Sequence, residues 1–408
     1  MDLINFNKHW IKEYYYNFEK KRNYYDKMIK NIDSKYIDLI IGLRRVGKTT
    51  LMFQVINYLI KQGINRDNIL YYSFDLGNEI ENVINDYLRV SNKDILKDKI
   101  YVFFDEIQKV NDWQNKIKIY YDLYPNIKIF LSGSSSLFLK SSESLAGRIV
   151  ITNIKTLYFE EYLEFKDLKY YLDKPRLYEK NLILEFEKYL YRQYYDIINS
   201  NLFDAKDYVF NLKNKIIKED ANDFFNVNYP ELLLKLFDIV AANPGITIDY
   251  HNLGNDLNVD WRTIQTYIYY LEESFLINKV YNYSANLLSS EKKQKKAYLN
   301  CSSFFSGNGE ISGELFENYI QNYFDFKYFY RHSKNEVDFV GVTQQGKIYA
   351  IEVKYRENIK KEHMKGLSYF QKKFKVDKKI IISKNVDEIF GDVIVVPFWK
   401  LESINMNN

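Results

Sequence analysis

The sequence has little cysteine and no long apolar run. A single thiol, Cys301, is present in 408 residues, which excludes a disulfide framework and any metal site built from cysteines alone. No stretch reaches the roughly 18 consecutive apolar residues of a membrane-spanning helix, and residues 1–12 lack the apolar core of a secretion signal. We therefore expect a cytoplasmic protein with no membrane partner.

The chain also lacks a strong charge of one sign. Its 58 basic and 54 acidic residues leave a formal net charge of +4, so any contact with nucleic acid has to be local. Hydrophobic residues make up 46% of the chain and charged residues 27%, which excludes a disordered or fibrous protein. The length predicts two or three domains. The 39 tyrosines and 28 phenylalanines suit core packing first and stacking on bases second.

Apolar strand patterns alternate with helical patterns in the first third of the chain. We expect strands at 36–41, 69–74, 100–104 and 127–131, and helices at Trp10–Lys30 and Lys48–Lys61. This alternation predicts a parallel sheet covered by helices, which is an α/β fold. Helices are predicted from Phe159 to about Phe237, short helices and an apolar run over Ala241–Tyr283, and a second α/β pattern from Gly313.

A glycine-rich motif follows the first predicted strand. Residues 42–49, GLRRVGKT, fit G-x-x-x-x-G-K-[ST] between a strand and a helix, the context that a phosphate-binding loop requires. Lys48 is expected to contact the β- and γ-phosphates of ATP, and Thr49 to bind Mg²⁺. An ordinary glycine turn is the weaker alternative. The predicted ATP-binding residues are Gly42, Leu43, Arg44, Arg45, Val46, Gly47, Lys48, Thr49 and Thr50.

Two acids end the third predicted strand, as in a Walker B arrangement. The apolar residues 101–104 lead into Asp105 and Glu106 at the carboxyl edge. Asp105 is expected to hold Mg²⁺ and Glu106 to polarise the water that attacks ATP, which favours hydrolysis over binding alone. Without the preceding phosphate loop, a solvated strand end would explain the same pair.

Two further residues are candidates for sensing the nucleotide. Ser134, in the polar run 132–136, could sense the γ-phosphate or the attacking water. Arg148 could act as an arginine finger from a neighbouring subunit of a homo-oligomer or as an internal sensor. An ordinary surface arginine is an equally good interpretation.

These motifs together resemble those of a known group. The segments GLRRVGKTT at 42–50, DEIQ at 105–108, the serines at 132–136 and LAGR at 145–148 are similar to those of prokaryotic AAA+-like ATPases of the archaeal-ATPase type. The resemblance extends over nearly the whole chain. It implies a winged helix and a nuclease-like C-terminal domain, and it supports the architecture more than a biological role.

The middle of the chain has helix–turn–helix proportions. Residues 248–257 and the helix Trp261–Glu273 flank a short turn, and the lysine-rich loop that follows could serve as a basic wing. A winged helix that only docks proteins is the alternative. The predicted DNA contacts are Arg262, Gln265, Lys292, Lys293, Lys295 and Lys296, with Tyr269 on the same free face.

The C-terminal pattern resembles the PD-(D/E)XK nuclease fold. A predicted hairpin carries Asp338 on its first strand and Glu352 and Lys354 on its second. The two carboxylates could hold divalent cations, and Lys354 could orient hydroxide or offset charge in the transition state. Glu317 is the expected helix-borne acid, with Glu314 in reserve. Val337 stands where the proline of the motif would be, and a degenerate, inactive domain is the alternative.

We therefore interpret the chain as an ATP-hydrolysing DNA-processing protein that uses ATP and Mg²⁺, with branched or damaged DNA as a candidate substrate. The expected domains are a P-loop ATPase domain with an N-terminal helix at 1–165, a helical lid and winged helix at 166–300, and a restriction-endonuclease-like α/β domain at 301–408. The rival hypotheses are a regulatory ATPase switch and a protein-remodelling ATPase, both with an inactive nuclease-like domain.

Overall fold

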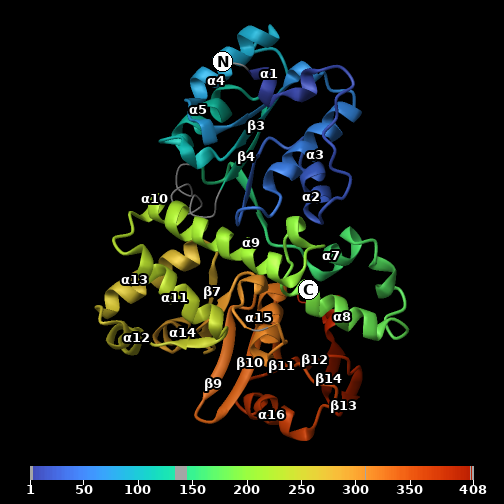
Figure 1. Cartoon of the computed structure of the whole chain (residues 1–408), viewed down its shortest axis with the longest axis vertical. Helices are drawn as coiled ribbons and strands as arrows, with labels where there is room; N and C mark the ends of the chain where they lie inside the picture. Colours follow the sequence, from blue (N-terminus) through green and yellow to red (C-terminus); the bar gives the residue numbers. More distant parts are fainter. Residues whose placement is uncertain (1–2, 134–144, 308, 405, 407–408) are drawn as a thin grey trace. The chain divides into compact units, whose positions relative to one another are not determined.

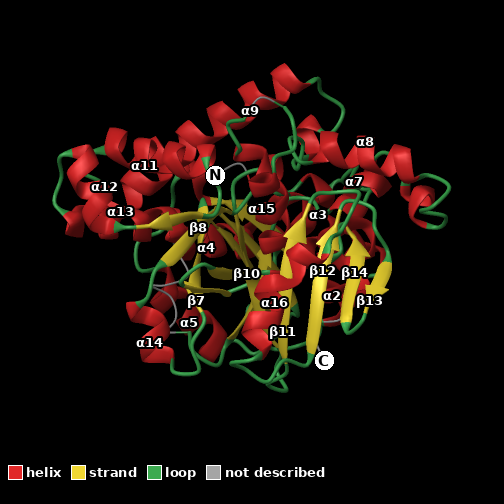
Figure 2. Ribbon diagram, turned by 90° about the horizontal axis from the view of Figure 1, so that it is seen from below, coloured by secondary structure: helices red, strands yellow, loops and turns green. Residues whose placement is uncertain are grey.

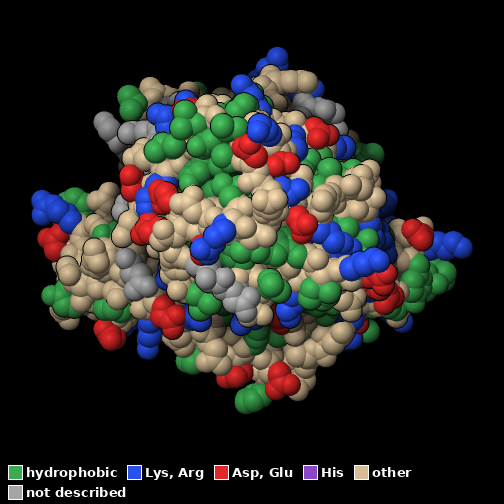
Figure 3. Space-filling view, turned by 90° about the horizontal axis from the view of Figure 1, so that it is seen from above, with side chains coloured by type: hydrophobic (Ala, Val, Ile, Leu, Met, Phe, Trp, Pro, Cys, Tyr) green, Lys and Arg blue, Asp and Glu red, His purple; other side chains and the backbone are tan. Residues whose placement is uncertain are grey.

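The computed structural model describes residues 3–133, 145–307, 309–404 and 406 (Figure 1). The chain divides into two compact units, Met1–Thr156 and Leu157–Asn408. In the part that is described, no helix has both the length and the apolar character needed to cross a membrane. Acidic and basic side chains are interspersed on the face drawn in Figure 3, as the balanced composition leads one to expect.

The first unit is built on a five-stranded parallel sheet in the order β2-β3-β4-β1-β5. Every residue of β1, β3 and β4 is buried, which accounts for their apolar runs, because a parallel sheet is covered on both faces. The strands are β1 (Ile37–Gly42), β2 (Ile69–Ser73), β3 (Ile100–Asp105), β4 (Ile127–Gly133) and β5 (Ile149–Ile154). The sequence predicted the first four strands but not β5.

The covering helices are α3 (Lys48–Lys61), α4 (Ile80–Ser91) and α5 (Trp113–Leu123). The predicted bounds of α3 are confirmed. Inside the sheet, the ammonium of Lys128 lies 2.7 Å from a carboxylate oxygen of Asp38 on the neighbouring strand, and both side chains are buried. Such a pair is tolerated because each charge has its partner.

The predicted N-terminal helix at Trp10–Lys30 is present only at its end, over Tyr24–Lys30, and is wrong for the rest of that range. The structure has α1 (Leu3–Phe6), a 3-10 turn at Lys8–Trp10 and a short α2 (Tyr24–Lys30), with non-helical chain between them. Side chains of the core bind this backbone instead: Asn57 bonds both the N–H and the carbonyl of Tyr16, and Gln54 donates to the carbonyls of Phe18 and Lys20. Tertiary hydrogen bonds thus replace those that a helix would make within itself.

The second unit contains one nine-stranded sheet in the order β13-β14-β12-β11-β10-β9-β7-β8-β6 (Figure 2). Its strands are β6 (Ile246–Ile248), β7 (Ile277–Asn282), β8 (Lys295–Leu299), β9 (Tyr328–His332), β10 (Asn335–Val342), β11 (Ile348–Lys354), β12 (Lys378–Ser383), β13 (Glu388–Phe390) and β14 (Val393–Pro397). Parallel pairing of β7 with β9 joins β6, β7 and β8 to the strands that follow. The middle and C-terminal segments therefore share one sheet.

Helices surround this sheet. They are α7 (Phe159–Phe165), α8 (Glu179–Tyr189), α9 (Leu202–Lys215), α10 (Asn222–Phe225), α11 (Pro230–Ala242), α12 (Tyr250–Leu257), α13 (Trp261–Glu273), α14 (Leu287–Lys292), α15 (Gly313–Phe324) and α16 (Lys365–Gln371). A π-helical turn at Ile216–Ala221 links α9 to α10. Helix α15 contacts β8 and β11, and α16 contacts β10 and β11. The helical character predicted between 159 and 237 is confirmed.

The burial of His9 in the N-terminal segment leads us to expect that the free energy of unfolding depends on pH. Its ring is buried between the carbonyl of Ile69 and the hydroxyl of Tyr16, each 3.0 Å away. Burial lowers the pKa of His9 from 6.5 to about 4, although the Ile69 carbonyl raises it in part. As the pH falls, the unfolded chain binds a proton on this imidazole near pH 6.5, whereas the folded protein binds it only near pH 4. The neutral imidazole therefore contributes stability above pH 6.5. This stability is lost as the pH falls towards 4, by up to about 3 kcal/mol.

Histidine-selective NMR titration measures this pKa directly. The resonance that disappears in His9→Gln should stay in its neutral form down to about pH 4, and unfolding of that variant should depend less on pH between 4 and 6.5. A midpoint near 6.5 for this resonance would contradict the buried placement of the ring.

Candidate functional site

The glycine-rich loop lies at the carboxyl end of β1. Gly42 ends the strand, and a Cβ atom there would collide with the backbone carbonyl of Ile154, so only glycine fits. Gly47 has a φ of +97° and stands immediately before α3, a conformation that glycine adopts without steric cost. The loop therefore meets the N-terminus of a helix, where free N–H groups and the helix dipole favour phosphate.

Lys48 is the cation of this loop. Its buried ammonium donates to the carbonyl oxygens of Gly42 and Leu43, at 3.1 and 3.0 Å. The ammonium is thus held inside the turn whose N–H groups would surround a phosphate chain. This geometry agrees with the predicted contact of Lys48 with the terminal phosphates of a nucleotide.

Asp105, at the end of β3, accepts hydrogen bonds from three side-chain hydroxyl groups. Thr49 donates to its Oδ2 at 2.6 Å and Tyr71 to the same oxygen at 3.1 Å, while Ser132 of β4 donates to Oδ1. Thr49 and Asp105 are the hydroxyl and carboxylate that the sequence assigns to Mg²⁺. Because they already touch, the donor set fits this hard, oxygen-preferring cation.

Glu106 follows Asp105 in the left-handed backbone conformation, with a φ of +53°. Burial raises the pKa of its carboxyl, the Lys48 ammonium lowers it in part, and the charge of Asp105 raises it further. The side-chain amide of Gln108 donates to one of its oxygens. A carboxylate whose pKa is raised in this way is a better acceptor for a proton from water.

The two predicted sensors differ in outcome. Ser134 lies outside the described residues, and the serine that contacts Asp105 is Ser132. Arg148 lies at the amino-terminal ends of the strands, opposite the phosphate loop. Its carbonyl accepts a hydrogen bond from the N–H of Ile37, the first residue of β1. The length of β1, about 20 Å, separates it from the phosphate loop. An internal-sensor role is therefore wrong, and the role of an arginine finger for a neighbouring subunit stays a prediction.

Arg148 has a partner within its own unit. Its guanidinium donates to both carboxylate oxygens of Asp122, at 2.9 and 3.2 Å. The side chain is partly exposed, so this pairing also fits the ordinary surface arginine that the sequence left open.

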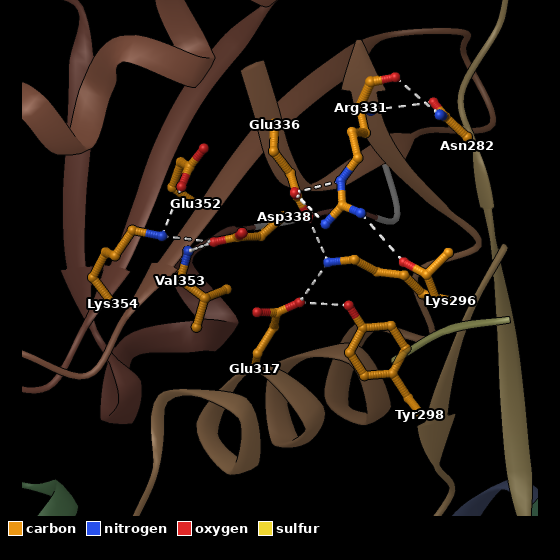
Figure 4. A network of polar contacts seen from close by, with 11 residues as sticks. Asn282, Lys296, Tyr298, Glu317, Arg331, Glu336, Asp338, Glu352, Val353 and Lys354 are labelled. Carbon is orange, nitrogen blue, oxygen red and sulfur yellow. Dashed lines mark hydrogen bonds and ion pairs between the residues drawn. The ribbon is translucent and has the colours of Figure 1, made fainter. Parts of the chain in front are cut away.

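A second group of ionisable side chains, the carboxylate–lysine network, lies in the other unit (Figure 4). Lys354 donates to Asp338 Oδ2 at 3.0 Å and lies 2.8 Å from Glu352 Oε2, so that one ammonium bridges two carboxylates. The N–H of Val353 also donates to Asp338, at 2.7 Å. The predicted grouping of Asp338, Glu352 and Lys354 on adjacent strands is thus present.

Glu317 joins the network from α15. Its Oε1 accepts from the hydroxyl of Tyr298 at 2.5 Å and from the ammonium of Lys296 at 3.2 Å. Lys296 also lies 2.6 Å from Glu336, which binds the guanidinium of Arg331. The reserve candidate, Glu314, is exposed in the first turn of α15 and makes none of the contacts drawn in Figure 4.

Lys296 is therefore not a wing residue that contacts DNA phosphates, and that prediction is wrong. Its side chain is only 6% exposed. Burial by itself lowers the pKa of Lys296, but the carboxylates of Glu317, Glu336 and Asp338 outweigh it and raise the pKa. A buried ammonium requires such partners, so strand β8 delivers this lysine to the network and not to solvent.

The network contains more acidic than basic side chains. Its four carboxylates face three cations, which are Lys296, Arg331 and Lys354. Burial raises the pKa of Glu352 well above its usual range, and Asp338 adds to this effect. Asp338 and Glu352 thus fit a divalent cation as a pair. Among the described residues, no group of three or more His, Cys, Asp or Glu is set to hold a metal ion.

One face of α13 is exposed, and the predicted DNA contacts on it stay a prediction. Arg262, Gln265 and Tyr269 are exposed on it, while Ile264, Ile268 and Leu271 are buried on the opposite face. Lys293 is exposed, and the ammonium of Lys295 donates to the carbonyl of Glu291 at 2.7 Å. Lys292 is the last residue of α14.

Sequence reasoning missed Tyr71, Glu336 and Arg331, and it did not predict the contacts that Ser132 and Lys296 make. A signal existed for two of these five residues: Ser132 directly follows the predicted strand 127–131, and Glu336 stands two residues before Asp338 and so lies on the same face of its strand. Tyr71, Lys296 and Arg331 come from other strands, and only the sheet order brings them in.

The fold and the phosphate loop define the first unit as an ATPase-type nucleotide-binding unit. Residues 34–163 match the family model of an "AAA domain", which supports an ATPase-like function. Residues 185–305 and 311–401 match two domains of unknown function, DUF8612 and DUF4143.

Relatives are similar over most of the chain. Two uncharacterized proteins of Methanocaldococcus jannaschii are 26% and 28% identical, covering 94% and 92% of this chain and 89% and 90% of their own lengths. An uncharacterized protein of Haemophilus influenzae is 27% identical over 64% of this chain and 66% of its own length.

Solved structures are only distantly similar. The Walker-type ATPase PABY2304 of Pyrococcus abyssi has a TM-score of 0.40 at 14% identity, with 71% of this chain and 95% of that chain covered. AMPPCP-bound DnaA of Aquifex aeolicus has a TM-score of 0.29 at 16% identity, with 63% and 90% covered. Similarity at this level supports no conclusion about function.

The contrast between Glu106 and Lys48 tests the ATP site. Glu106→Gln should keep ATP binding and lose hydrolysis by about 100-fold or more, because an amide cannot accept the proton of water. Lys48→Ala should weaken ATP binding as well, because it removes the cation of the loop. Phosphate release and binding of a fluorescent ATP analogue measure the two steps, with Glu81→Gln at an exposed position of α4 as the control. Loss of ATP binding in Glu106→Gln would contradict its role.

Proposed function

We propose that this protein hydrolyses ATP in its first unit and binds and cleaves DNA with its second. The bridging of Asp338 and Glu352 by the ammonium of Lys354 carries the nuclease part of the proposal. Carboxylates from two adjacent strands converge there on one cationic position, which supports a site for metal-dependent cleavage of a phosphodiester.

In the ATP site, the phosphate loop, the magnesium ligands and the catalytic carboxylate have separate roles. The loop around Gly47 and the ammonium of Lys48 hold the phosphates, and Thr49 and Asp105 would hold Mg²⁺. Glu106 takes the proton of the attacking water, and its raised pKa favours that step. Bound Mg²⁺ supplies neutralisation of the phosphate charge. Ser132 and Tyr71 keep the Asp105 carboxylate in place through their hydrogen bonds.

In the second unit, Asp338 and Glu352 would hold a divalent cation, which when bound polarises the scissile phosphate and acidifies water. Lys354 keeps a positive charge beside the phosphate. Burial lowers the pKa of this lysine, but Asp338 and Glu352 outweigh burial and raise it, so the ammonium stays protonated at neutral pH. A permanent cation at this point stabilises the charge that develops in the transition state.

The segment from α11 to β8 would present the DNA to this site as a winged helix. Helices α12 and α13 pack on each other, α11 packs on α13, and the pairing of β6 and β7 with β8 supplies the small sheet of such a domain. Exposed Arg262 and Gln265 lie on the free face of α13. They carry the charge and the amide that contact phosphates and base edges.

A regulatory or remodelling ATPase with an inactive second unit is the other candidate. The observation that favours it is the pairing within the network: Lys354 already satisfies the two carboxylates, and Lys296 satisfies Glu317 and Glu336. Buried, mutually paired charges of this kind also occur as purely structural features. Cleavage assays decide between the two.

Isosteric variants test the nuclease proposal. Asp338→Asn and Glu352→Gln should each remove Mg²⁺- or Mn²⁺-dependent cleavage of DNA, because they neutralise a metal ligand. Lys354→Met should keep metal binding and slow cleavage by about 100-fold. Gel assays on single-stranded, duplex and four-way DNA, with and without ATP, measure cleavage, and calorimetry measures metal binding.

Matched controls come from the same sheet. Glu388→Gln on β13 and Lys378→Met on β12 change exposed residues of the same types and should leave cleavage unchanged. ATP hydrolysis should persist in all five variants, because the ATP site has its own residues. Wild-type protein that cuts none of these DNAs with either metal would refute the nuclease part and favour the switch.

A further inference from the structure

A cavity of about 320 Å³ lies beside the exposed face of α13. Its walls come from α12, α13, β7, α14 and β8, all in the segment from α11 to β8. Three tyrosines contribute to its lining, which are Tyr250, Tyr269 and Tyr281. Gln265 and Thr266 add an amide and a hydroxyl from the exposed surface of α13. The lining thus offers a ligand both aromatic rings and hydrogen-bonding groups.

The lysines at this cavity are already paired. Lys279 lies 2.5 Å from the carboxylate of Glu272, and Lys295 lies 3.6 Å from that of Glu291. Lys295 also donates to the carbonyl of Glu291. A phosphate would have to compete with these carboxylates for both ammonium groups. A neutral ligand has no ion pair to break, so the charges of this cavity favour an uncharged occupant.

The size and the side chains select an aromatic heterocycle. A volume of about 320 Å³ is at the small end of ligand pockets, which suits one base-sized ring. Aromatic rings stack on any nucleobase, whatever its identity. Gln265 offers both a donor and an acceptor to the edge of a base. Tyr269 follows Gln265 by four residues and so lies on the same helix face, where the two can contact one ligand.

We propose that this cavity binds an unpaired nucleobase of DNA. The proposal rests on the DNA-binding part of the proposed function and narrows its substrate to strands that are single or locally opened. Stacked bases within a duplex keep their faces covered and cannot enter. Arg262 is exposed on the same face of α13, where it can hold the phosphate next to the inserted base.

Fluorescence anisotropy with a labelled oligonucleotide tests the proposal on the full chain. Binding is measured in EDTA, without ATP, for a single strand, for the matching duplex, and for a strand of equal length and charge whose central nucleotides are abasic. The wild-type protein should bind the single strand about 5-fold or more tightly than either of the other two, because only that strand offers stacking bases.

Variants of one tyrosine separate the ring from the fold. Tyr269→Ala should weaken binding of the single strand about 5-fold or more, while Tyr269→Phe should keep the affinity, because it keeps the ring. Tyr36→Ala is the matched control: Tyr36 is 42% exposed, as against 41% for Tyr269, and lies in the other unit. It should leave binding unchanged.

Several outcomes would overturn the proposal. Equal affinity for the abasic strand would show that phosphates, and not bases, provide the binding. An unchanged affinity in Tyr269→Ala would place the contact elsewhere. Tight binding of the duplex without preference for the single strand would refute the cavity and leave DNA binding intact. Failure to bind any of the three DNAs would refute the cavity together with DNA binding, while the ATP site would be unaffected.

Discussion

Parallel pairing of β1 with β4 and of β4 with β3 is the constraint on which the ATP site depends. Parallel strands end at the same edge of a sheet, so the phosphate loop after β1, Ser132 on β4 and Asp105 on β3 have to meet. The hydroxyl of Thr49 touches Asp105 across 56 residues of sequence. Arg148 directly precedes β5. Because β5 is also parallel to β1, Arg148 lies at the amino-terminal ends of the strands, away from the phosphate loop.

Charge pairing has the corresponding role in the second unit. Lys296 enters from β8, Glu317 from α15, and Glu336 and Asp338 from β10. Lys296 and Asp338 are buried, and Glu317 and Glu336 are partly buried. A charge withdrawn from water is costly unless it is matched. The pairing of β7 with β9 makes this meeting possible, because it aligns the small sheet that contains β8 with the hairpin of β10 and β11. The candidate winged helix and the candidate nuclease site therefore share one sheet.

Local patterns predicted much of this architecture. The bounds of α3 and the presence of the strand before it follow from apolar runs and a glycine-rich turn, and α13 follows from the spacing of Ile264, Ile268 and Leu271. The N-terminal helix failed because Asn57 and Gln54 bind the backbone of that segment from outside it. No window of local sequence contains those partners, so periodicity alone favoured a helix there.

The sequence by itself determined the principal residues of both candidate sites: the phosphate loop with Lys48, the acids Asp105 and Glu106, and the trio Asp338, Glu352 and Lys354 all stand in short segments with recognisable spacing. Tertiary structure alone decided what surrounds them. It turned Lys296 from an expected surface contact into a buried partner of Glu317, and it brought Tyr71 to Asp105. The physical reason is that strand order and burial are set by pairing between distant segments. The local sequence around a lysine on a strand is the same whether its side chain faces solvent or carboxylates.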